Sequence, residues 1–213
     1  MTPAIVGVGN LGGVLARCLV AGGEHVVLAA RDRSYAEALA HELGPLARAA
    51  SVEDAIALGD AVVLALMLNT IRELTPKLAY LLEEKVVVDP SNPITFDEKG
   101  QMMRTLPQRQ SAGSLVAALL PTGAHYVKAF GSLGADALAE GSYREPRGVL
   151  FYATDDDEAA KAGERLIRAA GFEPLKAGGV ADAGRIEAPG GDLNGQIMNL
   201  DEARAAVATR LPA

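Results

Sequence analysis

Three glycines near the amino terminus have the spacing of a phosphate-binding loop. Gly7, Gly9 and Gly12 follow a short apolar run and precede a helical pattern. In such a loop the first glycine allows a tight turn, the second lets the backbone approach a pyrophosphate, and the third lets the helix pack on the strand. The free N–H groups at the start of the helix, where Asn10 and Leu11 lie, would hold the pyrophosphate charge. The alternative is a turn that is rich in glycine only for packing.

The end of the second apolar run indicates which dinucleotide the loop would bind. Enzymes that use NAD place Asp or Glu there, ~20 residues after the glycines, to bind the ribose hydroxyls. This sequence has Ala30 instead, followed by Arg31 and, two residues on, Arg33. A guanidinium can bind a 2′-phosphate through charge-assisted hydrogen bonds, so we expect NADP(H) rather than NAD(H). The alternative is a solvated turn, because Asp32 lies between the two arginines.

Other reactive residue types lack the spacing of a site. The histidines His25, His41 and His125 have no second ligand at metal spacing, so we expect surface or capping roles and no bound metal. The acidic run 155–158 directly precedes an alanine-rich helix, whose positive end carboxylates stabilise. The single cysteine, Cys18, falls on the inner face of the first helix and is expected to be buried.

The scarcity of acid–base groups bears on the kind of reaction. A dehydrogenase that oxidises an alcohol needs a general base near the path of the hydride. Lys128 and Tyr126 are the only candidates on a strand that leads to the relevant sheet edge, and we assign no catalytic residue. Hydride exchange between NADPH and a flavin-like ring needs mainly stacking and orientation, since the cofactors carry the chemistry. The sequence therefore favours reductase chemistry on a planar acceptor.

Alternating apolar runs and helical patterns define the elements that would position these residues. The expected strands cover residues 4–8, 26–30, 47–50, 61–66, 86–89, 125–129, 149–153 and 172–176. This alternation with short connections predicts an α/β fold with a doubly wound, mostly parallel sheet of the Rossmann type. We expect one NADP-binding domain over residues 1–195 with appended strands, and a C-terminal helical extension over 196–213.

Some segments are expected to depart from regular structure. Residues 90–110 are too polar for a core and are predicted to be irregular. Pro76 is expected to kink or split a helix over 70–82, because proline lacks the N–H that the helix needs. Ser34, with Glu37 three residues later, has the pattern of a capping box at the start of a helix.

The overall composition limits the classes of partner. Hydrophobic residues make up 49% of the 213 residues, and the formal net charge of −7 leaves no basic field for nucleic acid. One cysteine excludes an intramolecular disulfide framework. The first residues lack the pattern of a secretion signal, and no apolar run approaches the ~20 residues of a membrane helix. We therefore expect a cytoplasmic protein that does not contact a membrane.

Several blocks of residues occur in the same order as in a known family. They are Gly9-Asn10-Leu11-Gly12, Ala30-Arg31, Asp89-Pro90-Ser91-Asn92-Pro93, Lys128-Ala129-Phe130 and Ala177-Gly178 with Gly184-Arg185-Ile186-Glu187. The chain resembles the NADP-dependent deazaflavin (coenzyme F-420) oxidoreductases over residues 4 to about 195. It is also similar to the dinucleotide domain of the six-transmembrane metalloreductases. The blocks around Asp89 and Lys128 are the more discriminating ones, because many Rossmann proteins share the first block.

The resemblance implies an eight-stranded sheet, NADPH across its carboxyl edge, and a second redox molecule laid against the nicotinamide. The residues that it places beside the dinucleotide are Met67, Leu68 and Asn69 near the ribose, and Pro90, Ser91 and Asn92 near the nicotinamide. The residues that it places in the acceptor pocket are Ser91, Phe130, Gly131, Ser132 and Leu133. Relatives usually carry Asn or His where Gly131 stands, so a polar contact is missing here. The metalloreductases' transmembrane half is absent, so haem-linked iron reduction is not expected.

The expected function is that of an NADP(H)-dependent oxidoreductase with a deazaflavin- or flavin-like second substrate. One alternative is an imine or hydroxy-acid reductase, although those relatives carry a large helical C-terminal domain that this chain lacks. Another is a catalytically silent NADP(H) sensor that binds a protein partner, which the glycine at 131 favours. The expected partner is the small-molecule acceptor. A homodimer, in which the partner is a second copy of the chain, is left open.

Overall fold

Runs of Val, Ile, Leu and Ala form a sheet that is buried on both faces in the structure, a computed structural model that describes residues 1–209. The strands of this sheet are β1 (Pro3–Val6), β2 (Val26–Ala29), β3 (Ala47–Ala49), β4 (Ala61–Leu64), β5 (Val86–Asp89), β8 (His125–Ala129), β9 (Val149–Ala153) and β10 (Glu173–Gly178). Their order across the sheet is β10-β9-β8-β5-β4-β1-β2-β3.

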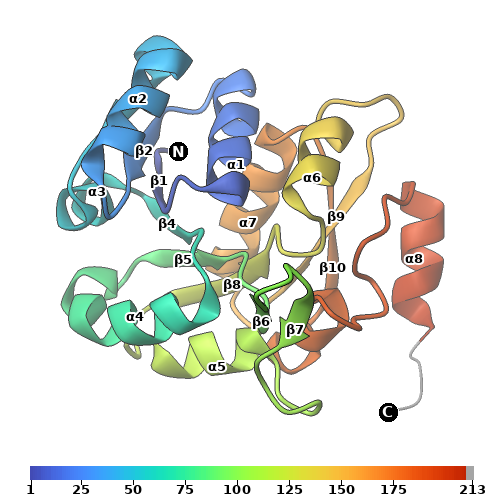
Figure 1. Ribbon diagram of the computed structural model, residues 1–213. Coiled ribbons are helices and arrows are strands. Elements are labelled where there is room, and N and C mark those ends of the chain that lie inside the picture. The colour runs from blue at the N-terminus through green and yellow to red at the C-terminus, as the bar shows by residue number, and fades with distance from the viewer. Residues whose placement is uncertain (210–213) are drawn as a thin grey trace.

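Helices cover both faces of the sheet (Figure 1). Those on one face are α1 (Asn10–Ala21), α2 (Arg33–Leu43), α6 (Ala135–Gly141) and α7 (Asp157–Ala169). Those on the other face are α3 (Val52–Leu58), α4 (Leu68–Leu82) and α5 (Ala112–Leu119). Successive residues of a strand serve the two layers: Ile5 packs in the core under α1, and Val6 packs in the core under α4. Cys18 is buried in the first of these cores, as expected.

Within this sheet the neighbouring strands β3, β2, β1, β4, β5 and β8 are all parallel. Only the pairing of β8 with β9 is antiparallel. Lys128 on β8 lies opposite Ala153 on β9, and β9 and β10 are parallel to each other. The predicted Rossmann-type, mostly parallel sheet of about eight strands is therefore confirmed. Strands β1, β2, β4, β5 and β8 all end at one edge, which we call the carboxyl edge. In sheets of this kind ligands bind along that edge.

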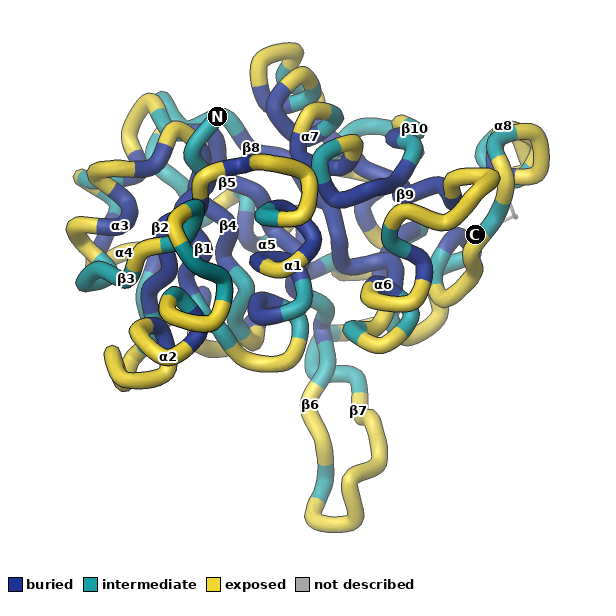
Figure 2. Tube along the Cα trace, turned by 90° about the horizontal axis from the view of Figure 1, so that it is seen from above, coloured by how far each residue is buried: buried dark blue, intermediate teal, exposed yellow. Residues whose placement is uncertain are grey.

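The segment 90–110, predicted to be irregular, contains a hairpin. Strands β6 (Ile94–Phe96) and β7 (Met102–Arg104) pair antiparallel in a separate two-stranded sheet. Figure 2 shows the hairpin projecting from the body of the protein. Most of its residues are exposed, and an amphipathic alternation is absent, so the hydrophobic pattern gave no strand signal.

Helix α4 is continuous through Pro76, so the prediction of a kinked or split helix is wrong about a split. Ile71, Thr75 and Leu78 are buried on the face that packs on the sheet. This packing holds the helix together although one backbone hydrogen bond is missing at the proline. Sequence patterns also gave no sign of α6, nor of the 3₁₀ segments η1 (Gly44–Leu46) and η2 (Val180–Ile186).

The C-terminal helix α8 (Leu200–Ala208) begins at Asn199, whose side chain accepts hydrogen bonds from the N–H groups of Asp201 and Glu202. The segment before it is tied to the sheet, since the N–H of Val149 on β9 donates to the carbonyl of Met198. The predicted division of the chain at residue 195 stays a prediction. The last four residues of the predicted helical extension, 210–213, lie outside the described residues.

Candidate functional site

The turn between β1 and α1 has the geometry expected of a phosphate-binding loop. Gly7 has φ +98°, and a Cβ on it would overlap the carbonyl of Ala65. A Cβ on Gly12 would overlap the Gly7 carbonyl, so this glycine permits the close packing of helix on strand. By contrast, no other atom of residues 1–209 lies within 4 Å of the position that a Cβ on Gly9 would take. The middle glycine therefore faces open space, where a pyrophosphate could approach the backbone.

The first turn of α1 is free to receive an anion. No side chain caps the helix at Gly9, and the first turn contains no acidic residue. Beside it lies a groove of ≈ 380 Å³ between α1 and α2. Its lining includes Asn10 from α1 and Tyr35 from α2. Uncapped N–H groups and the helix dipole together favour a phosphate at this position.

The three residues after β2 have separate tasks. Arg31 is exposed and makes no hydrogen bond or ion pair within residues 1–209. Asp32 caps α2, because its Oδ1 accepts from the N–H of Ser34 at 3.0 Å and from its hydroxyl at 2.7 Å. These hydrogen bonds hold the pKa of Asp32 below its ordinary value. Arg33 is paired with Glu37 at 2.8 Å. Arg31 is thus the guanidinium available for a 2′-phosphate.

The capping residue of α2 differs from the prediction. We expected Ser34 to be the N-cap with Glu37 in a capping box, but the cap is Asp32. Glu37 instead pairs with Arg33 one helical turn away. The acidic residue between the two arginines therefore has a structural role, and its carboxylate is engaged by Ser34.

At the ends of β5 and β8 lies a buried network, formed by the side chains of Asp89, Tyr126, Lys128 and Glu187. Lys128 Nζ lies 3.0 Å from Asp89 Oδ2 and 3.6 Å from Glu187 Oε1, and it also donates to the carbonyl of Ser91. The Tyr126 hydroxyl donates to Asp89 Oδ2 at 2.8 Å. The sequence blocks that contain Asp89, Lys128 and Glu187 meet in these contacts, which sequence order alone could not reveal.

Glu187 ties the buried network to helix α5. Its two carboxylate oxygens accept hydrogen bonds from the N–H groups of Ala112, at 2.9 Å, and Gly113, at 2.7 Å. A carboxylate at the first turn of a helix is also favoured by the helix dipole. In the sequence, Glu187 is marked only by its place in the motif 184–187, which indicates no role for it.

The buried network removes the two candidate bases from consideration. Lys128 is fully buried and held by Asp89 and Glu187. Burial raises the pKa of Tyr126 well above its usual range, and the Asp89 carboxylate adds to the rise. Tyr126 therefore stays protonated, and its hydroxyl donates a hydrogen bond to Asp89. Neither side chain is therefore free to accept a proton from a substrate, although the two were the only candidate bases on this strand.

Asn92 joins three segments of the carboxyl edge. Its amide nitrogen donates to the carbonyl of Gly131 at 2.9 Å, and its amide oxygen accepts from the N–H of Ala188 at 2.8 Å. Both ends of the side chain are therefore engaged, and a contact of Asn92 with nicotinamide stays a prediction. Just before it, the hydroxyl oxygen of Ser91 is buried and has no hydrogen-bond partner among the described residues.

The predicted acceptor-pocket residues are largely inside the protein. Phe130 and Leu133 lie in the core beneath α1, and Ser132 is buried too. A Cβ on Gly131 would lie 2.6 Å from the carbonyl oxygen of Pro90. The space beside this glycine is therefore filled by backbone, not left for a ring, and the positive φ of 67° belongs to Phe130. The side chains of Phe130 and Leu133 do not line an open pocket, and the wider acceptor assignment stays a prediction.

The residues after β4 divide in a similar way. Met67, at the start of α4, is 46% exposed, and Asn69 is exposed one position beyond Leu68. Leu68 itself is buried in the core under α4, so only its backbone could border a dinucleotide. Met67 and Asn69 remain candidates for contact with the ribose.

Comparison with known proteins finds a family model that matches the first part of this chain. Residues 2–93, which contain the glycine loop, Arg31 and the segment after β5, match the family NADP oxidoreductase coenzyme F420-dependent. The predicted NADP-dependent oxidoreductase is thereby confirmed as a class, and so is the resemblance drawn from the sequence blocks.

Individual relatives extend the likeness over most of the chain. Metalloreductase STEAP3 of Rattus norvegicus is 33% identical over 184 residues, which are 86% of this chain and 35% of that protein. The chain therefore spans about a third of the length of that relative. The structure of the hypothetical protein SMa0349 of Sinorhizobium meliloti superposes with a TM-score of 0.81 at 29% identity, covering 93% of this chain and 95% of that one.

A further structure shares the fold. It is a candidate F420-dependent NADP reductase from Arthrobacter sp. FB24, with a TM-score of 0.72 and 23% identity, and the match covers 85% of this chain and 86% of that one. Within residues 1–209 no helix combines the length and apolar content that crossing a membrane requires. The predicted cytoplasmic location stays a prediction.

Proposed function

We propose that the protein transfers hydride between NADPH and a planar redox acceptor of the flavin or deazaflavin kind. The observation that carries the proposal is the pairing of the open space at Gly9 with the unpaired guanidinium of Arg31. One can receive a pyrophosphate and the other a 2′-phosphate, and both lie at the carboxyl edge. NADP(H), when bound, supplies the hydride chemistry.

The chain's own residues would bind and orient the dinucleotide. The first turn of α1 would hold the pyrophosphate, and Arg31 would select the phosphorylated ribose. The buried network and Asn92 fix the backbone of residues 90–92, against which we place the nicotinamide. The unpartnered hydroxyl of Ser91 in that segment is the kind of group that a bound molecule could satisfy.

The acceptor class follows from the acid–base groups near the edge. Lys128 and Tyr126 are buried and engaged, so alcohol oxidation would lack its general base. A planar redox ring needs only to be stacked and oriented for hydride transfer. The same observation supports a second candidate function, a catalytically silent NADP(H) sensor, because such a protein needs no acid or base at all.

Turnover with several acceptors distinguishes the two functions. Purified protein is mixed with NADPH and, in separate reactions, with a flavin, a deazaflavin or a quinone. With at least one acceptor, we expect the amount of acceptor reduced to equal the amount of NADPH consumed. Binding of NADPH without turnover of any of these acceptors would instead support the sensor.

A further inference from the structure

A cavity of ≈ 540 Å³ opens beside the carboxyl edge, separate from the groove at the glycine loop. Its walls come from the foot of the β6–β7 hairpin, the segment before α5 with the start of α5, η2, and the turn that follows η2. This volume is in the range of sites for small molecules. We call it the arginine cavity, because its lining includes Arg104 and Arg109.

The charge of the arginine cavity is not balanced by its own walls. No Asp or Glu occurs among the lining residues that the structure describes, although the whole chain has a formal net charge of −7. Arg109 is exposed and makes no hydrogen bond or ion pair within residues 1–209. Ser111 and Ser114 add hydroxyl groups to the same walls. Such a lining fits an anionic group better than a neutral one.

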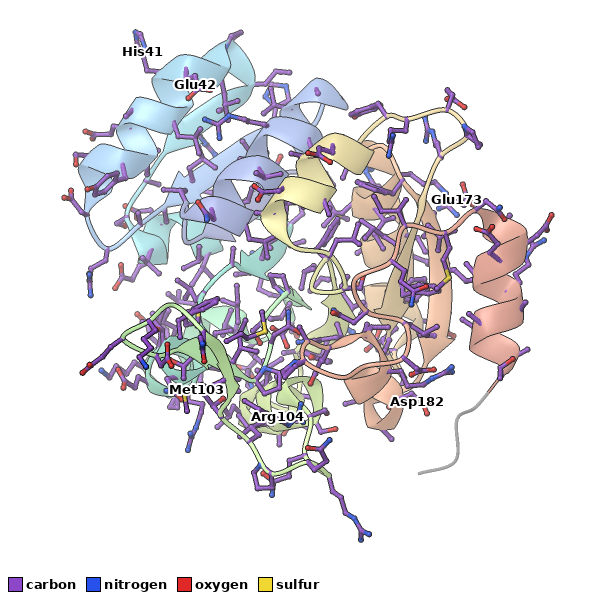
Figure 3. The ribbon with its side chains drawn as sticks, turned by 45° about the vertical axis from the view of Figure 1, so that its right-hand side comes forward. His41, Glu42, Met103, Arg104, Glu173 and Asp182 are labelled. Carbon is purple, nitrogen blue, oxygen red and sulfur yellow. The ribbon has the colours of Figure 1, made fainter. Side chains whose placement is uncertain are left out.

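Arg104 is held rigidly in the cavity wall. Its guanidinium donates to three backbone carbonyls, those of Leu106 at 3.1 Å, Gln110 at 2.6 Å and Pro189 at 3.3 Å. In Figure 3 Arg104 lies where the chain leaves the hairpin. Carbonyl partners orient the guanidinium without neutralising it, so its positive charge remains available to a ligand. A fixed cation of this kind costs little further ordering when an anion binds.

The arginine cavity adjoins the segment where we place the nicotinamide. Pro189, in its wall, directly follows Ala188, whose N–H donates to Asn92. Asn92 also holds the carbonyl of Gly131. A molecule with its ring against residues 90–92 could therefore extend a charged substituent toward the arginines.

We propose that the arginine cavity binds the anionic side chain of the redox acceptor, so that acceptors with a phosphate or carboxylate tail are preferred. The inference rests on the proposed function for the identity of the ligand, and on the cavity itself for the charge. Arg109 would form charge-assisted hydrogen bonds to the anion, and Arg104 would supply a fixed positive field.

A pair of flavins tests the proposal, because FMN and riboflavin share one ring system and differ by a phosphate. Each is titrated with the full-length protein in saturating NADP⁺, and binding is followed by quenching of flavin fluorescence. We expect FMN to bind at least ~tenfold more tightly than riboflavin, as a charged hydrogen bond would provide. In Arg109→Gln the two dissociation constants should come within about threefold, with riboflavin unchanged.

Two further variants control the experiment. Arg109→Lys keeps the charge and should retain most of the preference for FMN. Arg48→Gln removes the same charge from exposed β3, at the far edge of the sheet, and should leave the preference intact. Equal affinity for the two flavins in the unmodified protein, or a preference that survives Arg109→Gln, would overturn the proposal. Because binding is measured without turnover, a protein that discriminates the flavins but does not oxidise NADPH would contradict only the proposed hydride transfer.

Discussion

At the scale of single residues, the dinucleotide site depends on what is absent from two positions. Gly9 has no side chain where the backbone faces open space, and β2 is followed by no carboxylate that could bind ribose hydroxyls. Asp32 does not take that part, because it is committed to capping α2. Arg31 is then the residue with the reach and the charge to distinguish the two nicotinamide dinucleotides.

Arg31→Ala should weaken NADPH binding at least ~tenfold and change NADH binding little, because only NADPH carries the 2′-phosphate. Arg33→Ala should have a smaller effect, since Arg33 is already paired with Glu37. Titration of each variant with both dinucleotides measures the two ratios. Equal dissociation constants for NADPH and NADH in the unmodified protein would contradict the assignment.

Gly9→Val should abolish dinucleotide binding in a folded protein, since its side chain would fill the open space without touching the protein. Gly12→Val is the matched control and should unfold or strongly destabilise the chain, because even a Cβ overlaps the Gly7 carbonyl. Circular dichroism separates the two effects, and cofactor titration measures the first. Normal NADPH affinity in folded Gly9→Val would show that the loop is only a packing turn.

Residue types and local spacing were enough to predict the glycine loop and Arg31, because each acts through its own backbone or charge. Side-chain partners over long separations were not predictable. Lys128 was a candidate base because of its strand, and only the structure shows Asp89 and Glu187 around it. The resemblance placed Gly131 in the acceptor pocket, but the carbonyl of Pro90 occupies the space beside this glycine.

At the scale of elements, the buried network fastens the ends of β5 and β8 to the first turn of α5. Lys128→Met should lower the free energy of unfolding by ~3–5 kcal/mol, because two buried carboxylates lose their cation. Adding Asp89→Asn should recover part of the loss, since one of those charges is then removed. Urea unfolding of both variants measures the difference. A Lys128→Met protein as stable as the unmodified protein would contradict this account.

The start of α7 contains a contact that depends on pH. His125 Nδ1 lies 2.7 Å from Asp156 Oδ2, and this hydrogen bond raises the pKa of His125 above its ordinary value. A raised pKa in the folded state means that the contact stabilises fully below the ordinary value of 6.5 and is lost as pH rises through the folded value. The free energy of unfolding should therefore fall as pH rises from the ordinary value of 6.5 through the folded value.

His125→Ala should flatten this pH dependence, as urea unfolding at several pH values would show. Asp156 does not interfere in this range. Partial burial alone would raise its pKa, but hydrogen bonds from the N–H of Ala159 and from His125 hold it below the ordinary carboxyl value. An unchanged slope in His125→Ala would show that the contact contributes nothing to the pH dependence.

At the scale of the whole molecule, the alternation of strands and helices predicted the parallel sheet, because buried strands and amphipathic helices leave clear periodic patterns. The antiparallel pairing of β9 with β8 left no such pattern, because tertiary contacts set the direction of the strand. The β6–β7 hairpin left none either, because most of its residues are exposed. The fold brings the glycine loop, Arg31 and residues 90–92 to one edge, which is where an extended dinucleotide would lie.

The most direct test of the proposed function is anaerobic oxidation of NADPH by the purified protein with flavin, deazaflavin and quinone acceptors, followed by loss of NADPH absorbance. The account predicts that at least one acceptor is reduced in equal amount to the NADPH consumed, and that Gly9→Val abolishes the reaction. NADPH that binds but is not consumed with any of the three acceptors would contradict it.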